Sequence, residues 1–472
     1  MIEVLQSILA LLVSLSILVT VHEFGHYWMA RKCGVHVLRF CVGFGKPIYT
    51  YRVKPIQTEP QAGLHTGTRS NEPLPATEFC IAAIPLGGYV KMLDQREAFV
   101  ADDQVHYALN GKPVLQRIAI AAAGPIANFL LAILAYWLLF ASGVTGIIPV
   151  IGTLSTDSPA HFSGLKAGQE ILQVDGHDTP TWSEVNLKLF ERLGETGSVS
   201  FQVSEAGSLG TTGEYEVEIT DWLVGEDEPR PARALGLVPR IPKYRADIGE
   251  IVPGGRAEQA GLRVGDRITA INGVALDSWA DLVRLLQANA EVSLKVDIAR
   301  GGQASTLLIT PAAVVENGRT KGVIGAARLV APWPKEMLRK IQYPIYSAWL
   351  PAVEKTIDIS VFTLGSIIKM IEGVISPKNL SGPITIAQIA NQTAQSGLES
   401  FIGFIALLSI SLGIINLLPI PMLDGGHLLY YMVELLTGKA LPEKIQEYGY
   451  QLGLALILGI MVLAFYNDFM RL

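Results

Sequence analysis

Residues 22–26 carry side chains whose types and spacing suit metal-assisted hydrolysis, since they read His-Glu-Phe-Gly-His. On a helix, positions i and i+4 share one face, so His22 and His26 can bind one metal ion together. Glu23 lies beside them as a candidate general base. A chance match in a chain of this length has a probability of about 1%. The alternative is a polar cluster whose groups only satisfy one another.

A catalytic zinc usually takes three protein ligands and a water molecule, so another segment must supply the third ligand. The best candidate is Asp424, because residues 416–427 read NLLPIPMLDGGH. Pro419 and Pro421 interrupt an apolar run just before this carboxylate. Irregular backbone at membrane depth is tolerated only where it lines a buried or wet site. The alternative is a helix end in which Asp424 and Gly425 only form a turn.

The composition indicates a membrane protein with soluble parts. Of the 472 residues, 50% are apolar and 17% are charged, whereas soluble domains carry about 25% charged residues. A disordered chain is excluded, because such chains are poor in apolar residues. Three cysteines exclude a small disulfide scaffold, and a net charge of −6 gives no sign of a nucleic-acid partner.

Four uncharged stretches approach the roughly 20 residues that a membrane-crossing helix needs. They are residues 4–21, 118–142, 401–423 and 448–467. Eleven Lys and Arg residues lie between Arg31 and Arg117, which places that segment in the cytosol and both termini outside. A fifth apolar stretch, 356–375, contains three charged residues, so we expect an amphipathic helix on the membrane surface.

This topology tests the metal site. With four crossings, the first and third spans run in the same direction, from outside to inside. His22, His26 and Asp424 then reach the same cytosolic side. A fifth crossing at 356–375 would carry Asp424 to the opposite face, too far away to share a metal ion.

The external region repeats itself with a period of 97 residues, so that Gly152 and Trp182 correspond to Gly249 and Trp279. Each copy predicts a short helix, a turn and an alternating strand. The pattern resembles the PDZ domain, which binds extended peptides as an added strand. The alternative is a spacer or size filter that binds no peptide. The region has no cysteine, so we expect no dependence on disulfide bonds.

The motifs together resemble the site-2 protease family of intramembrane zinc metalloproteases, in its form with two tandem PDZ domains. The resemblance is carried by H-E-x-x-H in the first span, N-x-x-P-x-P-x-L-D-G at 416–425 and the repeat between them. Further matches are GFG at 43–45, PLGGYVK at 85–91, GPIANF at 124–129 and SGP at 381–383. One departure is a Pro- and Thr-rich stretch, 57–77, which is longer than usual for the family and has no assigned role.

The resemblance implies Zn²⁺ held by His22, His26 and Asp424, with Glu23 as the catalytic base. It implies substrate binding by Asn416 and Pro419, although Asn416 could instead stabilise an oxyanion or bond to a helix end. It also implies a membrane-entering β-hairpin, including Gly87, Gly88 and Tyr89, that clamps the substrate as an extended strand. A cytosolic hairpin packed on the spans is the alternative.

The implied substrate is a single-span membrane protein, such as an anti-sigma factor or a remnant signal peptide, already shortened outside the membrane. Its truncated terminus or another peptide is expected at the PDZ domains. The protein is expected in the lipid bilayer of the bacterial inner membrane. Both termini and the PDZ domains would be periplasmic, with the active site toward the cytosol.

The expected fold is membrane α-helical, with four transmembrane helices, a membrane-associated β-hairpin and two tandem external PDZ-like α+β domains. The expected boundaries are 1–35 for the first span, 36–113 for the cytosolic hairpin segment, 114–143 for the second span, 144–225 and 245–315 for the PDZ-like domains, 226–244 for a linker, 316–397 for the amphipathic segment, 398–430 for the third span, and 431–472 for the fourth span and C-terminus.

Three other functions compete with this interpretation. A prenyl-protein or heat-shock type membrane protease would use a downstream glutamate ligand, for which Glu434 is the nearby candidate. A non-catalytic PDZ membrane scaffold with a structural metal site would have no need of Glu23 as a base. A transporter is disfavoured, because the spans contain no inverted repeat and are few.

Overall fold

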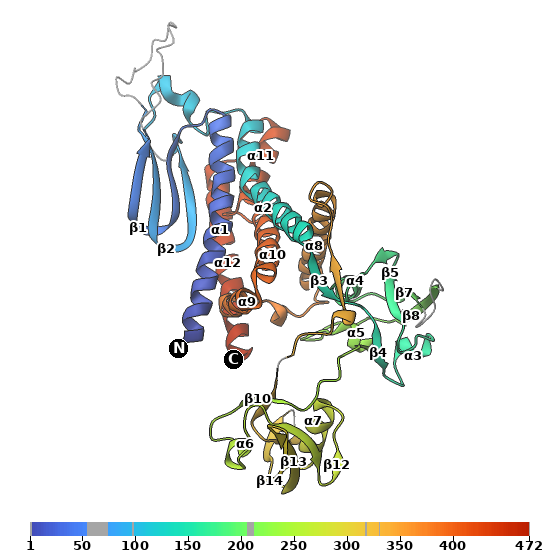
Figure 1. The fold of residues 1–472 in the computed structure, drawn as a ribbon. Coiled ribbons are helices and arrows are strands. Elements are labelled where there is room, and N and C mark those ends of the chain that lie inside the picture. Colours follow the sequence, from blue (N-terminus) through green and yellow to red (C-terminus); the bar gives the residue numbers. More distant parts are fainter. Residues whose placement is uncertain are drawn as a thin grey trace.

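The computed structural model describes residues 2–53, 74–96, 99–204, 212–316, 319–329 and 331–471. Most of the Pro- and Thr-rich stretch at 57–77 lies outside these described residues. The protein has a bundle of long helices, a β-sheet beside the bundle and two further β domains (Figure 1).

Within the described residues, four helices are long and apolar enough to cross a membrane: α1 (Ile2–Lys32), α2 (Val114–Ser142), α10 (Leu398–Leu417) and α12 (Glu443–Arg471). The expectation of four such helices is confirmed. The third is shorter than predicted, because the helix ends at Leu417 and the chain is extended at Leu418, just before Pro419. Figure 1 shows both termini at one end of the bundle, as an even number of crossings requires.

Helices α1 and α2 pack closely where the predicted metal motif lies. A Cβ atom on Gly25 of α1 would collide with the Ala123 carbonyl of α2, and one on Gly124 would collide with the His26 ring. The absence of side chains at both positions lets the two backbones approach each other. The second helix is therefore placed directly against the motif of the first.

Strands β1 (Val37–Val53) and β2 (Thr77–Met92) form a sheet beside α1 (Figure 1). Each strand folds back on itself, so the sheet has four arms. Cys41 in the first arm of β1 lies opposite Tyr89 on one side and Cys80 on the other, while Thr50 in the second arm lies opposite Cys80. The last arm of β2, residues 88–92, therefore forms one edge of this sheet.

The expectation about disulfide bonds concerned the external region, which has no cysteine; no pairing was predicted for the cysteines of this sheet. Cys41 and Cys80 are joined by a disulfide between neighbouring arms of this sheet, and Cys33 is free. The two cysteines are 39 residues apart in the sequence. They become neighbours only because both strands fold back, and the number and spacing of the cysteines do not indicate this.

The two β domains share one sheet topology, which agrees with the sequence repeat. Their four-stranded sheets have the orders β6-β5-β7-β8 and β12-β11-β13-β14. The first contains β5 (Glu170–Val174), β6 (His177–Asp178), β7 (Gly197–Ser204) and β8 (Thr212–Ile219), with α3 (Pro159–Phe162) and α4 (Trp182–Glu191). The second contains β11 (Arg267–Ile271), β12 (Val274–Ala275), β13 (Leu294–Arg300) and β14 (Gln303–Ile309), with α6 (Arg256–Gln259) and α7 (Trp279–Ala288).

Both β domains extend beyond their predicted boundaries. The predicted linker 226–244 contains α5 (Pro231–Ala234) and β9 (Leu237–Pro239), and β9 pairs with β4 (Ile151–Leu154). Ala232, Leu235 and Leu237 are buried in the core of the first domain, so this part is not a linker. Likewise, β17 (Ala326–Arg328) pairs with β10 (Ile248–Ile251), and β15 (Ala312–Glu316) pairs with β16 (Arg319–Val323), beyond the predicted end at 315. The pairings join segments far apart in sequence.

The predicted amphipathic segment contains α8 (Trp349–Ile371), which is not among the described helices apolar enough to span a membrane. One face packs against α2 and α10 through Ala352 and Ile359, whereas Ile357 and Val361 are exposed. Lys355 and Lys369 of α8 pair with Glu184 and Glu195 of the first β domain. This helix therefore joins that domain to the bundle.

The remaining elements complete the connections between these parts. Strand β3 (Val144–Ile147) follows α2 and pairs with β18 (Leu338–Ile341), and α9 (Pro383–Ser396) packs against α1. Helix α11 (Asp424–Thr437) lies against α2 at the end of the bundle opposite the chain termini (Figure 1). Short 3-10 helices are η1 (Asp102–Tyr107), η2 (Lys335–Met337) and η3 (Pro377–Asn379).

Candidate metal centre

The side chains of His22, His26 and Asp424 meet in the interior of the bundle. The histidines lie one turn apart on α1, and Asp424 is the first residue of α11. The Nε2 atoms of His22 and His26 are 3.2 Å apart, and Oδ2 of Asp424 lies 3.1 Å from the first and 3.3 Å from the second. The structure thus brings together the three residues that the sequence predicts as metal ligands.

These separations fit a zinc ion. Ligand atoms about 2.0–2.2 Å from a tetrahedral zinc lie about 3.3–3.6 Å from one another. Two imidazoles and one carboxylate are also a donor set that catalytic zinc sites use. Oδ2 of Asp424 is buried and makes no well-formed hydrogen bond within the described residues, so its lone pairs are free for a metal ion.

Helix α2 orients both imidazole rings. Nδ1 of His26 lies 2.8 Å from the Ile120 carbonyl oxygen, and Nδ1 of His22 lies 3.3 Å from the amide of Asn128. A carbonyl oxygen only accepts, so the His26 proton is on Nδ1 and the Nε2 lone pair faces the ligand cluster. Hydrogen bonds of this kind commonly fix the rings of metal-binding histidines.

A tight connector places Asp424. After α10, the Ile420 amide donates to the Leu418 carbonyl at 2.7 Å, and the Leu423 amide donates to the Ile420 carbonyl at 3.0 Å. Met422 has a φ of +98°, which is uncommon for a residue other than glycine and is found at strained functional sites. Asp424 then starts α11, where the positive end of the helix dipole favours its negative charge.

Glu23 lies between the ligand cluster and the edge of the β-sheet. Val90, in the edge arm, and Glu23 line the same cavity. A Cβ atom on Gly88 would lie 2.8 Å from the Cys41 carbonyl oxygen and 3.2 Å from Cγ of Glu23. The edge arm therefore approaches the candidate base at van der Waals distance, and only glycine fits at position 88.

A cavity of about 410 Å³ opens at this point. Of the residues predicted from the sequence, it is lined by His22, Glu23, His26, Tyr89, Asn416 and Asp424. Pro419, Gly87 and Gly88 are not part of the lining. Pro419 lies exposed in the connector, and the two glycines directly precede Tyr89 in β2.

Asn416 lies in the last turn of α10 and faces this cavity. Within the described part of the chain, the side-chain amide of Asn416 makes no hydrogen bond. At the helix end, the backbone amide of Leu418 donates to the carbonyls of Ile414 and Ile415. The alternative in which Asn416 closes the helix end is therefore not seen. Its amide is available to a group that enters the cavity.

Several residues of the site had no role in the sequence-based prediction. Asn128 and the Ile120 carbonyl contact the histidines, while Arg96, Arg117, His427 and Tyr431 line the cavity. Glu434, the rival metal ligand, instead forms an ion pair with Arg117 at 2.6 Å. The sequence does indicate Asn128 as unusual, because a polar side chain is costly in an uncharged span. The other residues contact segments that lie far away in the sequence, and no motif predicts that these segments are close.

The sequence matches the model of Peptidase family M50 over residues 10–62 and 70–460. The chain belongs to peptidase family M50. Relatives match over the full length of both chains: "Protease RseP" of Yersinia pestis is 42% identical, "Putative zinc metalloprotease" of Vibrio cholerae 40%, and "Regulator of sigma-E protease RseP" of Escherichia coli 39%.

Membership of M50 confirms the site-2 protease resemblance and the enzyme class. The chain is a membrane metalloprotease, and the name of the Vibrio relative supports zinc as its cofactor. The M50 match runs through both motif segments, 22–26 and 416–425. This family assignment replaces the three competing hypotheses, which were a prenyl-protein type protease, a transporter and a non-catalytic scaffold.

Proposed function

We propose that this protein is an intramembrane zinc metalloprotease that hydrolyses a peptide bond within or near the transmembrane segment of single-span membrane proteins. The observation that carries the proposal is the cluster of His22, His26 and Asp424, whose three ligand atoms lie 3.1–3.3 Å apart among membrane helices. The chain's membership of M50 supplies the reaction class.

In this proposal, His22, His26 and Asp424 hold the zinc ion and Glu23 is the catalytic base. Bound zinc supplies a Lewis acid that polarises a carbonyl group and acidifies water. Glu23 takes a proton from the attacking water and delivers it to the nitrogen of the leaving amine. Asn416, whose amide faces the cavity, binds the substrate backbone.

The edge arm 88–92 presents the substrate to this site. A transmembrane helix hides its peptide bonds in internal hydrogen bonds, so a protease must first unwind it. Tyr89 and Val90 line the cavity beside Glu23, and within the described residues no strand pairs with the outer edge of this arm. An unwound substrate segment can add to that edge as a further strand.

The proposed substrate class is supported by the same arrangement and by the names of the relatives. Relatives from Salmonella typhimurium and Escherichia coli carry the name "Regulator of sigma-E protease RseP", which supports an anti-sigma factor as the substrate here. Remnant signal peptides form a second group with one short span. In both cases we propose that prior shortening outside the membrane allows the substrate to reach the site.

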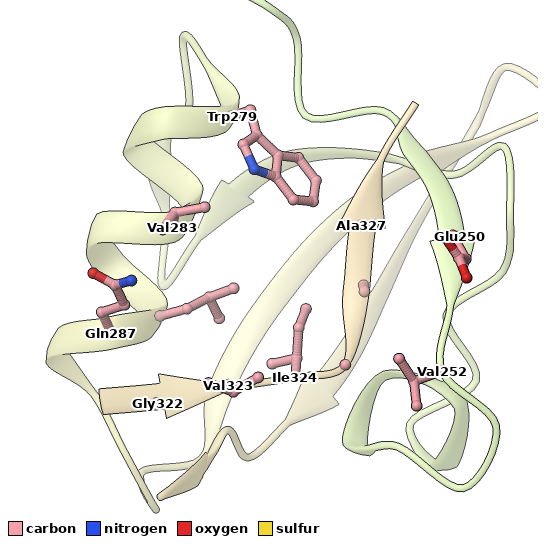
Figure 2. A pocket seen from close by; sticks show the side chains of 12 residues that line it. Glu250, Val252, Trp279, Val283, Gln287, Gly322, Val323, Ile324 and Ala327 are labelled. Carbon is pink, nitrogen blue, oxygen red and sulfur yellow. The ribbon is translucent and has the colours of Figure 1, made fainter. Parts of the chain in front are cut away.

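The two β domains are proposed to be PDZ domains that handle the shortened terminus. In the second, a groove of about 330 Å³ lies between α7 and the segment that ends in β17 (Figure 2). Val283 and Trp279 of α7 face Ile324 and Ala327 across it. An apolar groove beside a short strand suits an extended peptide with an apolar end.

The proposed location is the bacterial inner membrane. The basic residues between Arg31 and Arg117 support a position of the metal cluster toward the cytosol. The two termini lie at the opposite end of the bundle (Figure 1), which supports a periplasmic position for them and for the β domains.

The test is cleavage of a single-span membrane protein by this protease in liposomes, with its external part intact or removed. We expect cleavage of the shortened form alone, loss of cleavage after zinc is removed by a chelator, and recovery when zinc is restored. Asp424→Ala should bind no zinc and cleave nothing. Cleavage that persists without zinc would overturn the proposal.

A further inference from the structure

Asn128 of α2 is the polar side chain in this membrane helix that contacts a predicted metal ligand. The residue is fully buried, at 0% exposure, and its amide lies 3.3 Å from Nδ1 of His22. It does not line the cavity, so it is placed to act on His22 rather than on a substrate. Its second amide atom, Oδ1, is buried without a hydrogen-bond partner within the described residues.

The chemistry of imidazole decides which amide atom should face His22. A neutral histidine that binds a metal through Nε2 carries its proton on Nδ1 and donates it. An amide nitrogen in front of that proton would place two donors against each other. The oxygen and nitrogen of an amide have nearly the same shape, so a half turn of the side chain brings Oδ1 to His22 in the same space.

His26 shows the same arrangement with an unambiguous acceptor. Its Nδ1 lies 2.8 Å from the Ile120 carbonyl oxygen. Ile120 and Asn128 are eight positions apart on α2, about two helical turns, so both acceptors lie on the face toward α1. One helix thus supplies a hydrogen-bond acceptor to each of the two imidazoles.

The backbone of Asn128 is held in place independently of its amide. The Ser409 hydroxyl of α10 donates to the Asn128 carbonyl at 2.8 Å, and both residues are fully buried. This bond links α2 to the helix that carries Asn416. The side chain therefore projects from a fixed position, as the orientation of a ligand requires.

We propose that Asn128 is a positioning residue: its Oδ1 accepts the Nδ1 proton of His22 and so fixes the tautomer and the angle of that ring for metal binding. The inference rests on the proposed zinc site. Removing such a partner typically lowers metal affinity about 10- to 100-fold.

The test is zinc affinity of the full-length protein, measured by competition with a chromophoric chelator. Asn128→Leu keeps the branching at Cγ, with more bulk, but has no acceptor, and we expect its zinc affinity to fall about 10- to 100-fold. Asn128→Asp keeps an acceptor, and we expect it to retain most of the affinity. Ser142→Ala, which removes a hydroxyl that bonds only to Leu138 and Leu139 in the last turn of α2, is the control on the same helix and should bind zinc like the wild type.

The outcomes separate this inference from the proposed function. If wild type binds zinc in an Asp424-dependent manner but Asn128→Leu binds it equally tightly, the positioning role is wrong and the zinc site stands. If Asn128→Asp loses as much affinity as Asn128→Leu, packing and not the acceptor is responsible, and the inference fails. If the wild type itself binds no zinc, the proposed function fails.

Discussion

Arg117 on α2 and Glu434 on α11 form a two-point ion pair across 317 residues of sequence. Nη1 and Nη2 of Arg117 donate to the two carboxylate oxygens at 3.0 Å and 2.6 Å. Nε of Arg117 donates to the Lys112 carbonyl, and the guanidinium lies 5.0 Å from the centre of the Tyr431 ring. The pair ties the helix that begins with Asp424 to the helix that orients the histidines.

We predict that breaking this pair disturbs the zinc site. Both side chains are mostly buried, so removing one leaves an unpaired charge and costs about 3–5 kcal/mol. Arg117→Met or Glu434→Gln should lower thermal stability and zinc affinity, whereas the exchange Arg117→Glu with Glu434→Arg should recover part of both. Glu228→Gln, in an exposed pair with Arg230, is the control and should change little. Equal effects in the single and exchanged variants would contradict a role for the pair.

A second prediction concerns the edge arm. Gly88→Ala places a methyl group 2.8 Å from the Cys41 carbonyl oxygen and 3.0 Å from Val19, so the arm must move away from Glu23. We expect cleavage to fall strongly while zinc remains bound. Gly459→Ala, where nothing lies within 4 Å, is the matched control and should cleave normally. Normal cleavage by Gly88→Ala would show that the close approach is not needed.

A third prediction concerns the groove of the second β domain. Val283→Trp fills the space between α7 and Ile324, so binding of a labelled peptide with an apolar C-terminal residue should be lost. Val264→Trp adds the same bulk at a position that is 63% exposed and should leave binding unchanged. Fluorescence anisotropy with the full-length protein measures both. If the wild type binds no such peptide, the domain acts as a size filter.

A fourth prediction concerns pH and the stability of that domain. Asp266 is buried, and Arg300 donates to both of its oxygens at 2.7 Å. This hydrogen bonding holds the pKa of the Asp266 carboxyl below its usual value. Because the unfolded chain binds the proton more readily, the stabilisation is complete above the ordinary carboxyl pKa of about 3.9 and is lost as the pH falls below it.

Arg300→Met should therefore destabilise the domain strongly at pH 7 and much less at about pH 3. Hydrogen exchange of the β11 and β13 amides, corrected for intrinsic rates, measures this difference. An equal loss of protection at both pH values would show that packing, rather than the charge of Asp266, is responsible.

The candidate metal ligands were largely predictable because they lie in two short sequence motifs. The spacing of His22 and His26 needs only a helix, and Asp424 follows from two prolines and the parity of the spans. Asn128, Arg117 and Glu434 could not be assigned in this way, because each acts through a partner on another helix. The sequence shows that such residues are polar in apolar surroundings but not what they face.

The fold was predictable to the level of helices and repeats. Four apolar runs predicted the membrane helices. The 97-residue period predicted two similar domains, and in the structure their sheets have the same strand order. The boundaries failed where β9 and β17 return to strands far earlier in the chain, because pairing over such distances leaves no local signal. The Cys41–Cys80 bond was missed for the same reason.

The most direct test of the central claim compares the wild type with Glu23→Gln in liposomes that contain a shortened single-span substrate, with bound zinc measured in the same samples. We predict that both bind zinc equally and that the variant loses cleavage, by at least the 10²- to 10⁴-fold that a general base typically contributes. Equal cleavage by both would contradict the account, because zinc held by His22, His26 and Asp424 would then not act with Glu23 as its base.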